Sequence, residues 1–366
     1  MALIRALTIF YDYRETPRES STHEYLTSLL NKLYDYIESK GLKRSIWSIR
    51  LALPVSQTKE ELIRAYNIAS KVLETHPEIL VAALHIDNLA KLQDDFMKLF
   101  MDYPLYGSVL VKKHDEAVAA AEFLLKLSYQ APEAATRMAI ALGERLLTPY
   151  FPLASQIRRG QGLGIAMLYP NDLLRAKNMR DIKSIISKIC MEADSVGRGI
   201  SLSISIDWYG TDLSLSPWMD NSVGEVLERL SSKKIGDLEI METIYLLNKT
   251  IEDIVISKYG YRTSTGFNEV MLPVAEDNVL KDRVLERRLT LRDLILYTMV
   301  SVAGVDMVVL PEDTPRSYLS ALLTSVQYIS EIKKKPLGVR VIIYPGAREG
   351  DVVELGKFGK VPVIKI

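Results

Sequence analysis

The chain is poor in several features that would each point to a class of protein. Its single cysteine, Cys190, excludes an internal disulfide and a cysteine-based metal cluster. Lysine plus arginine and aspartate plus glutamate both number 46, and no basic tract stands out beyond Lys333–Lys335, which argues against a nucleic-acid binder. The first apolar stretch is too short and too soon charged for a signal peptide or a membrane-spanning helix. We therefore expect a cytoplasmic protein without nucleic-acid or membrane partners.

Glutamine is also scarce, with six residues, whereas isoleucine, leucine, tyrosine, glutamate and arginine are frequent, and this favours a thermophilic source. The 366 residues, 48% hydrophobic and 25% charged, suffice for one large α/β domain or two ordinary ones. A homodimer is compatible with a soluble protein of this size.

Ten short apolar runs rich in β-branched residues predict strands, and segments of helical period lie between most of them. In Thr58–Leu73, for example, Thr58 and Glu61 form a capping box at the start of an amphipathic helix. The run Pro132–Leu147 predicts more helix without an intervening strand. Strands separated by helices predict a largely parallel sheet. The ten runs are Ile4–Phe10, Ile46–Leu53, Ile79–Leu84, Gly107–Val111, Gly164–Leu168, Ile200–Ile206, Asp253–Ser257, Glu269–Leu272, Met307–Leu310 and Val339–Ile343.

Five motifs follow one another in the second half of the chain. They are DLSLSP (Asp212–Pro217), NSVGEVLE (Asn221–Glu228), LPVAEDN (Leu272–Asn278), GVDMVVLPEDTP (Gly304–Pro315) and GAREGDVVELG (Gly346–Gly356). Their order and spacing resemble the domain-of-unknown-function family seven-one-one, often labelled "PFL family protein", which is classed beside pyruvate formate-lyase-like glycyl radical enzymes. The match is dense over Gly199–Ile366 and looser before it.

The resemblance implies a closed ten-stranded α/β barrel of two five-stranded halves, with a hairpin in its lumen. We expect one domain over residues 1–366, with halves of about 1–198 and 199–366 and a C-terminal hairpin over 351–366. The alternative is two separate doubly wound domains with a hinge near Thr148–Gly160. The resemblance implies no particular reaction.

Glycyl radical chemistry is not expected. Tyr259-Gly260-Tyr261 resembles a radical loop superficially, but Ser257 stands where that pattern has arginine, and the segment is far from the C-terminus. Cys190 shares one helical face with isoleucines, so it is expected to be a small buried hydrophobe.

Three groups of carboxylates follow predicted strands of the second half. Because parallel strands deliver their carboxyl ends to one side, we expect these groups to line one cavity there. Candidate catalytic residues are Asp212, Glu276, Asp277, Glu312 and Asp313. Candidate ligand-binding residues are Ser214, Asp207 and Arg348. If a divalent cation such as Mg²⁺, Mn²⁺ or Ca²⁺ is bound, its ligands are expected to be Asp212, Asp277 and Asp313.

Structural roles compete with these assignments. Glu276 and Asp277 could simply favour the positive end of the helix that they begin. Ser216 and Thr314 are expected to be helix caps beside the site, with Pro315 at the first helical position, and Asp306 could face solvent. Two functions are compatible with the sequence: a small-molecule enzyme that uses carboxylates as general acid and base, with or without a divalent cation, or a non-catalytic metabolite-binding or regulatory protein.

Overall fold

A single ten-stranded sheet is the framework of the molecule. In the computed structural model, which describes residues 2–15, 19–260 and 265–366, the strands pair in the order β7-β6-β1-β2-β3-β4-β5-β10-β9-β8. Strands β1 to β5 are parallel to one another, whereas β6 and β7 at one side, and β8 to β10 at the other, run in the opposite direction. The strands are β1 (Leu3–Tyr11), β2 (Ile49–Ala52), β3 (Leu80–Ile86), β4 (Tyr106–Val111), β5 (Met138–Leu142), β6 (Gln161–Leu168), β7 (Asp207–Asp212), β8 (Met271–Pro273), β9 (Ala303–Leu310) and β10 (Leu337–Ile343).

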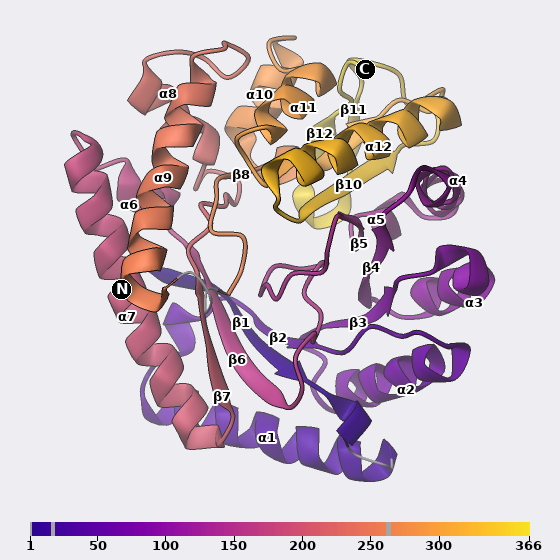
Figure 1. Ribbon diagram of the computed structural model, residues 1–366, viewed down its shortest axis with the longest axis vertical. Coiled ribbons are helices and arrows are strands. Elements are labelled where there is room, and N and C mark those ends of the chain that lie inside the picture. Colours follow the sequence, from indigo (N-terminus) through magenta and orange to yellow (C-terminus); the bar gives the residue numbers. More distant parts are fainter. Residues whose placement is uncertain (1, 16–18, 261–264) are drawn as a thin grey trace.

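Helices cover the outer side of the curved sheet, as Figure 1 shows. Helix α2 illustrates why: the Thr58 side chain accepts the Glu61 amide at its start, and the apolar residues Leu62, Ala65 and Ile68 are buried. The longer helices are α1 (Glu19–Ser39), α2 (Lys59–Thr75), α3 (Leu89–Asp102), α4 (His114–Gln130), α7 (Met179–Ile204), α9 (Ile240–Tyr259) and α12 (Arg316–Lys333). The shorter ones are α5 (Pro132–Ala135), α6 (Pro170–Leu173), α8 (Val223–Ser231), α10 (Asn278–Leu285) and α11 (Leu291–Thr298).

The two edge strands of the sheet, β7 and β8, are not paired with each other. The segment after β7 makes isolated parallel bridges on both sides of β8, between Leu215 and Val270 and between Met219 and Asp277. The sheet is therefore strongly curved but not closed by a ladder of hydrogen bonds, and the closed barrel stays an expectation. Strands from both halves of the chain belong to this one sheet, whereas two doubly wound domains would each have a sheet of their own.

Three element predictions were wrong. Ile200–Ile206 is mostly the end of α7, with β7 beginning just after it, and Asp253–Ser257 lies within α9, because an apolar run of this length fits a buried helix as well as a strand. Strand β5 was missed inside the run Pro132–Leu147, since its sequence MAIAL has a single β-branched residue, Ile140, among good helix formers. The other eight runs contain or overlap strands, and the C-terminal hairpin of β11 (Val352–Glu354) and β12 (Lys360–Pro362) is confirmed.

The concave side of the sheet is partly filled by the connection between β5 and β6, which runs through the interior in Figure 1. Its residues Leu147, Phe151 and Ala154 form a small apolar cluster with side chains of the first strands. The segment also packs tightly on β10, because a Cβ placed on Gly338 would lie 2.4 Å from the Leu153 side chain. This connection fills part of the interior, and the rest is a cavity.

Among the described helices, none has the length and apolar character needed to cross a membrane. Cys190 is buried on α7, as its helical pattern predicted, with its Sγ 3.9 Å from the Tyr259 hydroxyl. Helix α9 ends at Tyr259 with Gly260 as its C-cap, and Tyr261 lies outside the described residues.

Candidate functional site

Asp212, the first of the predicted catalytic residues, is fully buried, and the backbone and neighbouring hydroxyls bind both its oxygens. It accepts the amides of Phe267 at 3.0 Å and Asn268 at 3.1 Å. The amide and hydroxyl of Ser214 donate at 2.9 and 2.6 Å, and the Thr148 hydroxyl donates at 3.2 Å. Asp212 and Ser214 thus hold a turn together, and neither lines the large cavity.

Asp277 has a similar environment at the start of α10. Its side chain caps that helix by accepting the amides of Val279 and Leu280, as the structural alternative anticipated. It also accepts the Ser222 hydroxyl at 2.6 Å and the Gly224 amide at 3.0 Å. Burial raises the pKa of both Asp212 and Asp277, and these hydrogen bonds oppose the rise.

The remaining predicted residues lie on the surface. Glu312 and Asp313 are exposed after β9, Asp207 is exposed at the start of β7, and Arg348 is exposed before the C-terminal hairpin. Of the candidate residues Asp212, Ser214, Glu276, Asp277, Glu312 and Asp313, only Glu276 lines the large cavity. The other five lie outside its lining.

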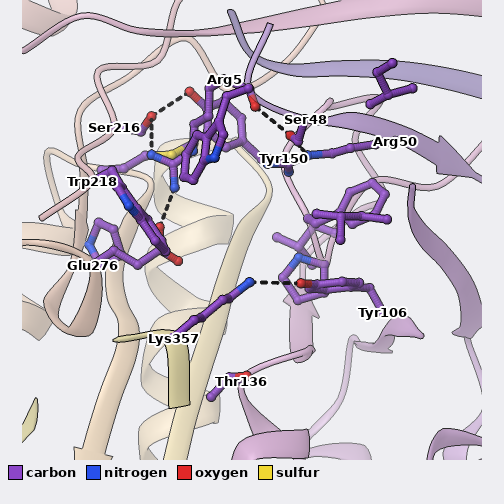
Figure 2. A pocket seen from close by; sticks show the side chains of 18 of the residues that line it. Arg5, Ser48, Arg50, Tyr106, Thr136, Tyr150, Ser216, Trp218, Glu276 and Lys357 are labelled. Atoms are coloured by element: carbon purple, nitrogen blue, oxygen red, sulfur yellow. Dashed lines mark hydrogen bonds and ion pairs between the residues drawn. The ribbon is translucent and has the colours of Figure 1, made fainter. Parts of the chain in front are cut away.

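The interior of the sheet contains a cavity of about 810 Å³. Most of the strand residues that line it lie in the amino-terminal halves of their strands, among them Arg5, Arg50 and Tyr106, whereas Ser216, Trp218 and Glu276 follow the carboxyl ends of β7 and β8. Residues of α1, of the β5–β6 connection and of the C-terminal hairpin complete it. Ten of the residues that line it are labelled in Figure 2: Arg5, Ser48, Arg50, Tyr106, Thr136, Tyr150, Ser216, Trp218, Glu276 and Lys357.

A chain of alternating charges crosses this cavity. Arg5 of β1 pairs with Glu276, whose other oxygen accepts from Arg340 of β10 at 2.9 Å. Arg340 in turn forms a two-pronged pair with Asp306 of β9. The guanidinium of Arg5 also lies 5.6 Å from the Trp47 ring, and its Nη1 donates to Ser216. In this series of four side chains each arginine has a carboxylate partner, so the two positive and two negative charges balance.

The backbone is irregular where Asp306 and Arg340 meet. Met307 has a φ of 53°, a left-handed conformation that is uncommon for a residue other than glycine. The pairing of β9 and β10 shifts register between Val339 and Val341, on either side of Arg340. Such bulges redirect side chains and are frequent beside functional sites. Here the bulge lies where both charged side chains enter the cavity.

Arg50 of β2 is the exceptional charge. Its residue is only 8% exposed, its Nε donates to the Ser48 hydroxyl at 2.9 Å, and its guanidinium lies 5.0 Å from the Phe151 ring. No carboxylate among residues 2–15, 19–260 and 265–366 pairs with it. Burial, together with repulsion from Arg5, lowers the pKa of Arg50 to about 10. The cavity therefore contains a buried positive charge without a counter-charge.

The pKa values of the two carboxylates in the cavity shift in opposite directions from their ordinary values. Burial alone would raise the pKa of Glu276, but Arg340 and Arg5 lower it below the ordinary value. Burial raises the pKa of Asp306, and Arg340 limits that rise. The same arginine thus acts on both carboxyl groups, and only for Glu276 does its effect, together with that of Arg5, outweigh burial.

Two sequence interpretations were wrong at this cavity. Asp306 does not face solvent but pairs with Arg340, and Ser216 is not a helix cap: it accepts from Arg5, and its hydroxyl is 2.9 Å from that of Tyr150. Thr314 does not cap α12 either, since the helix begins at Arg316 with Pro315 as N-cap, and the Thr314 hydroxyl donates to the Pro311 carbonyl.

The arginines of the cavity were missed, although the sequence contains a signal for them. Arg5, Arg50 and Arg340 each interrupt an apolar strand run, in LIRAL, IRLA and VRVII. Arginine is almost never fully buried without a partner, so a charge within such a run indicates a polar interior or a ligand.

In the described part of the chain, no three His, Cys, Asp or Glu side chains come close enough together to hold a metal ion. Asp212, Asp277 and Asp313 do not form such a group.

Sequence comparisons give the chain a family context. A family model described as Uncharacterised ACR (DUF711) matches residues 114–356, more than half of the chain. A UPF0210 protein of Methanocaldococcus jannaschii is 31% identical over 192 residues, which are 51% of this chain and 41% of that protein. UPF0210 proteins of Methanosarcina barkeri and Clostridium botulinum are 33% and 31% identical over 191 residues, again 50% of this chain and 41% of each relative.

The matched part thus spans less than half the length of these relatives. Several relatives come from thermophilic archaea, among them Methanocaldococcus jannaschii and Methanopyrus kandleri. The names of the relatives identify no ligand and no reaction, so any function has to be argued from the cavity itself.

Proposed function

We propose that this chain, which belongs to the uncharacterised DUF711 family, binds a small organic anion in the cavity inside its sheet. The observation that carries the proposal is Arg50, a buried guanidinium with a cavity beside it and no carboxylate partner among the described residues. The volume of about 810 Å³ falls within the range of small-molecule sites.

A buried, unpaired charge destabilises a fold unless something compensates for it. Arg5 and Arg340 are compensated by Glu276 and Asp306. Arg50 is left to be compensated by a ligand, and a planar guanidinium with free N–H groups matches the two oxygens of a carboxylate. The chemistry of the site therefore favours an acid as the ligand.

The walls beside Arg50 favour a ligand with an apolar or planar part. The rings of Tyr106 and Phe151 lie next to each other, with centroids 5.1 Å apart, and Phe151 lies against the Arg50 guanidinium. Burial of apolar ligand surface on these rings would add to the affinity that the charge provides.

Catalysis is a second candidate, and the carboxylates of the cavity favour it. Glu276 and Asp306 lie on the same charge chain, and their environments shift their pKa values in opposite directions, as acid and base pairs require. We assign the acid and base roles to these two residues and not to Asp212 or Asp277, whose oxygens are occupied by backbone amides. If wild type converts a bound acid to a product and Asp306→Asn does not, the result would support a catalytic function.

Calorimetric titration with simple monocarboxylates (acetate, butyrate and hexanoate) at low ionic strength tests the binding function. We expect Arg50→Met to weaken binding at least about tenfold, the loss expected for a charged hydrogen-bonded pair. Arg348→Met is the matched control, because this exposed arginine lies outside the cavity, and it should bind as wild type does.

The stability of the same variants without ligand shows whether a loss of binding is caused by unfolding. Arg50→Met should unfold at the same temperature as wild type or higher, since it removes a buried unpaired charge. Equal carboxylate affinity in wild type and Arg50→Met, or dependence on Arg348 alone, would contradict the proposal.

Other expectations from the sequence are retained as proposals. They are a pyruvate formate-lyase-like barrel, a homodimer, a cytoplasmic location, use of a divalent cation and the absence of glycyl radical chemistry. The curvature of the ten-stranded sheet supports the first of them, and the remaining four rest on sequence alone.

A further inference from the structure

A second cation enters the cavity from the C-terminal hairpin. Lys357 lies in the turn Gly356–Phe358 that joins β11 to β12, and it is one of the lining residues. Its neighbour Phe358 is only 5% exposed and contacts the Trp218 ring, and the Lys281 ammonium donates to the Phe358 carbonyl at 3.0 Å. Phe358 therefore anchors the turn beside the cavity through both its ring and its carbonyl.

The Lys357 ammonium is directed at an aromatic group and not at a carboxylate. Its Nζ donates to the Tyr106 hydroxyl at 3.2 Å (Figure 2). The same Nζ lies 5.8 Å from the centre of the Tyr106 ring. Within the described ranges no aspartate or glutamate pairs with Lys357. The residue is exposed at the edge of the cavity, so water solvates part of its charge.

Arg50 and Lys357, neither of which has a carboxylate partner among the described residues, share one aromatic surface. Arg50 lies against Phe151 at 5.0 Å and Lys357 against Tyr106 at 5.8 Å, and the two ring centroids are 5.1 Å apart. Glu276 and Asp306 do not neutralise either cation by contact, because both are paired with Arg5 and Arg340. The Tyr106 hydroxyl accepts from Lys357 and keeps its own proton for donation.

From this arrangement we infer that the ligand carries two acidic groups, one bound by Arg50 and the other by Lys357 with the Tyr106 hydroxyl, joined by a spacer that lies on Tyr106 and Phe151. The inference rests on the proposed function, since it takes Arg50 as the first anion site. It narrows the ligand to compounds of the dicarboxylate type, in which an acidic group stands at each end.

Calorimetry with paired acids of equal chain length tests this class. The probes are succinate against butyrate, adipate against hexanoate, and suberate against octanoate. One of the dicarboxylates should bind wild type about fivefold tighter than its monocarboxylate partner or better, the gain of one partly exposed ion pair. The length at which the gain peaks would measure the spacing of the two cations.

Two lysine variants decide the assignment. Lys357→Met should abolish the preference for the dicarboxylate while leaving the affinity for the monocarboxylate unchanged, and Lys357→Arg should preserve the preference. Lys360→Met is the matched control on the same hairpin, because Lys360 is exposed and does not line the cavity. An undiminished preference in Lys357→Met would overturn the inference.

The two proposals fail in different ways. If monocarboxylates bind through Arg50 but no dicarboxylate is preferred at any length, only the two-headed ligand is wrong. If no acid binds, both proposals are wrong. Phosphonopropionate, compared with succinate, distinguishes the kind of acid at the Lys357 end: tighter binding that depends on Lys357 would identify a phosphate-type group there, and it would still support two acidic ends.

Discussion

Glu276 and Asp277 are neighbours in sequence and serve opposite purposes in the structure. Glu276 points into the cavity and pairs with Arg5 and Arg340, which come from strands distant in sequence. Asp277 points away and binds amides of α10, the Gly224 amide and the Ser222 hydroxyl. Both side chains are buried, so burial alone does not distinguish a site residue from a structural one.

The partners make the distinction. A carboxylate whose oxygens are filled by backbone amides fixes the local chain and has no capacity left for a ligand. A carboxylate balanced by arginines on a cavity wall sets the charge of that cavity and can respond to what enters it. Asp212 belongs with Asp277 in this respect, and Asp306 belongs with Glu276.

The largest expected effect is that of breaking the charge chain. Glu276→Gln leaves Arg5 and Arg340 incompletely paired in a buried setting, and removal of one partner from such a pair typically costs about 3–5 kcal/mol of unfolding free energy. Urea unfolding at neutral pH measures it. A cost below about 1 kcal/mol would mean that solvent already compensates the arginines.

A smaller loss is expected from Asp277→Ala, which removes the cap of α10 and leaves the Gly224 amide and the Ser222 hydroxyl without an acceptor. We expect roughly 2–3 kcal/mol, combining a cap with unsatisfied buried donors. Asp313→Ala, an exposed residue of the same type, should change stability by no more than about 0.5 kcal/mol. Carboxylate affinity should stay as in wild type for both variants, and its loss in Asp277→Ala at a temperature where the variant is folded would contradict the comparison.

Acid titration provides the smallest but sharpest contrast. The pKa of Glu276 lies below its ordinary 4.5, so this group stabilises the fold above that pH, and the contribution disappears as pH falls further. The pKa of Asp277 lies above 3.8, so its ionisation disfavours the fold as pH rises past that value. The stability difference between wild type and Glu276→Gln should therefore shrink on acidification, and that for Asp277→Asn should grow. Thermal unfolding between about pH 3 and pH 7 measures both stability differences. If the two differences changed with pH in the same way, the opposite roles of Glu276 and Asp277 would be contradicted.

The sequence predicted most of the fold because long apolar runs leave few alternatives. Ile4–Phe10 and Val339–Ile343 are strands in the structure, and the capped pattern from Thr58 is a helix. The prediction failed at Ile200–Ile206, where local periodicity is compatible with both helix and strand and only the packing of α7 decides.

The site was harder to predict because its position depends on which way side chains leave the backbone. The rule that ligands lie at carboxyl ends of strands selected Asp212 and Asp277, whose oxygens turn back to their own loops. The same rule selected Glu276, which does line the cavity, but most of the strand residues around it lie in amino-terminal strand halves, and a bulge at Met307 helps to direct Asp306 into it. Arginines within apolar strands, at positions 5, 50 and 340, were the available signal.

Native mass spectrometry of the protein as purified from cells tests the central claim most directly, namely that Arg50 in the cavity holds an anionic ligand. We predict that wild type and Arg348→Met carry a bound small molecule of acidic composition and that Arg50→Met, folded to the same extent, lacks it. A bound acid retained by Arg50→Met, or lost only when Asp212 is changed to Asn, would contradict the account and return the site to the strand ends.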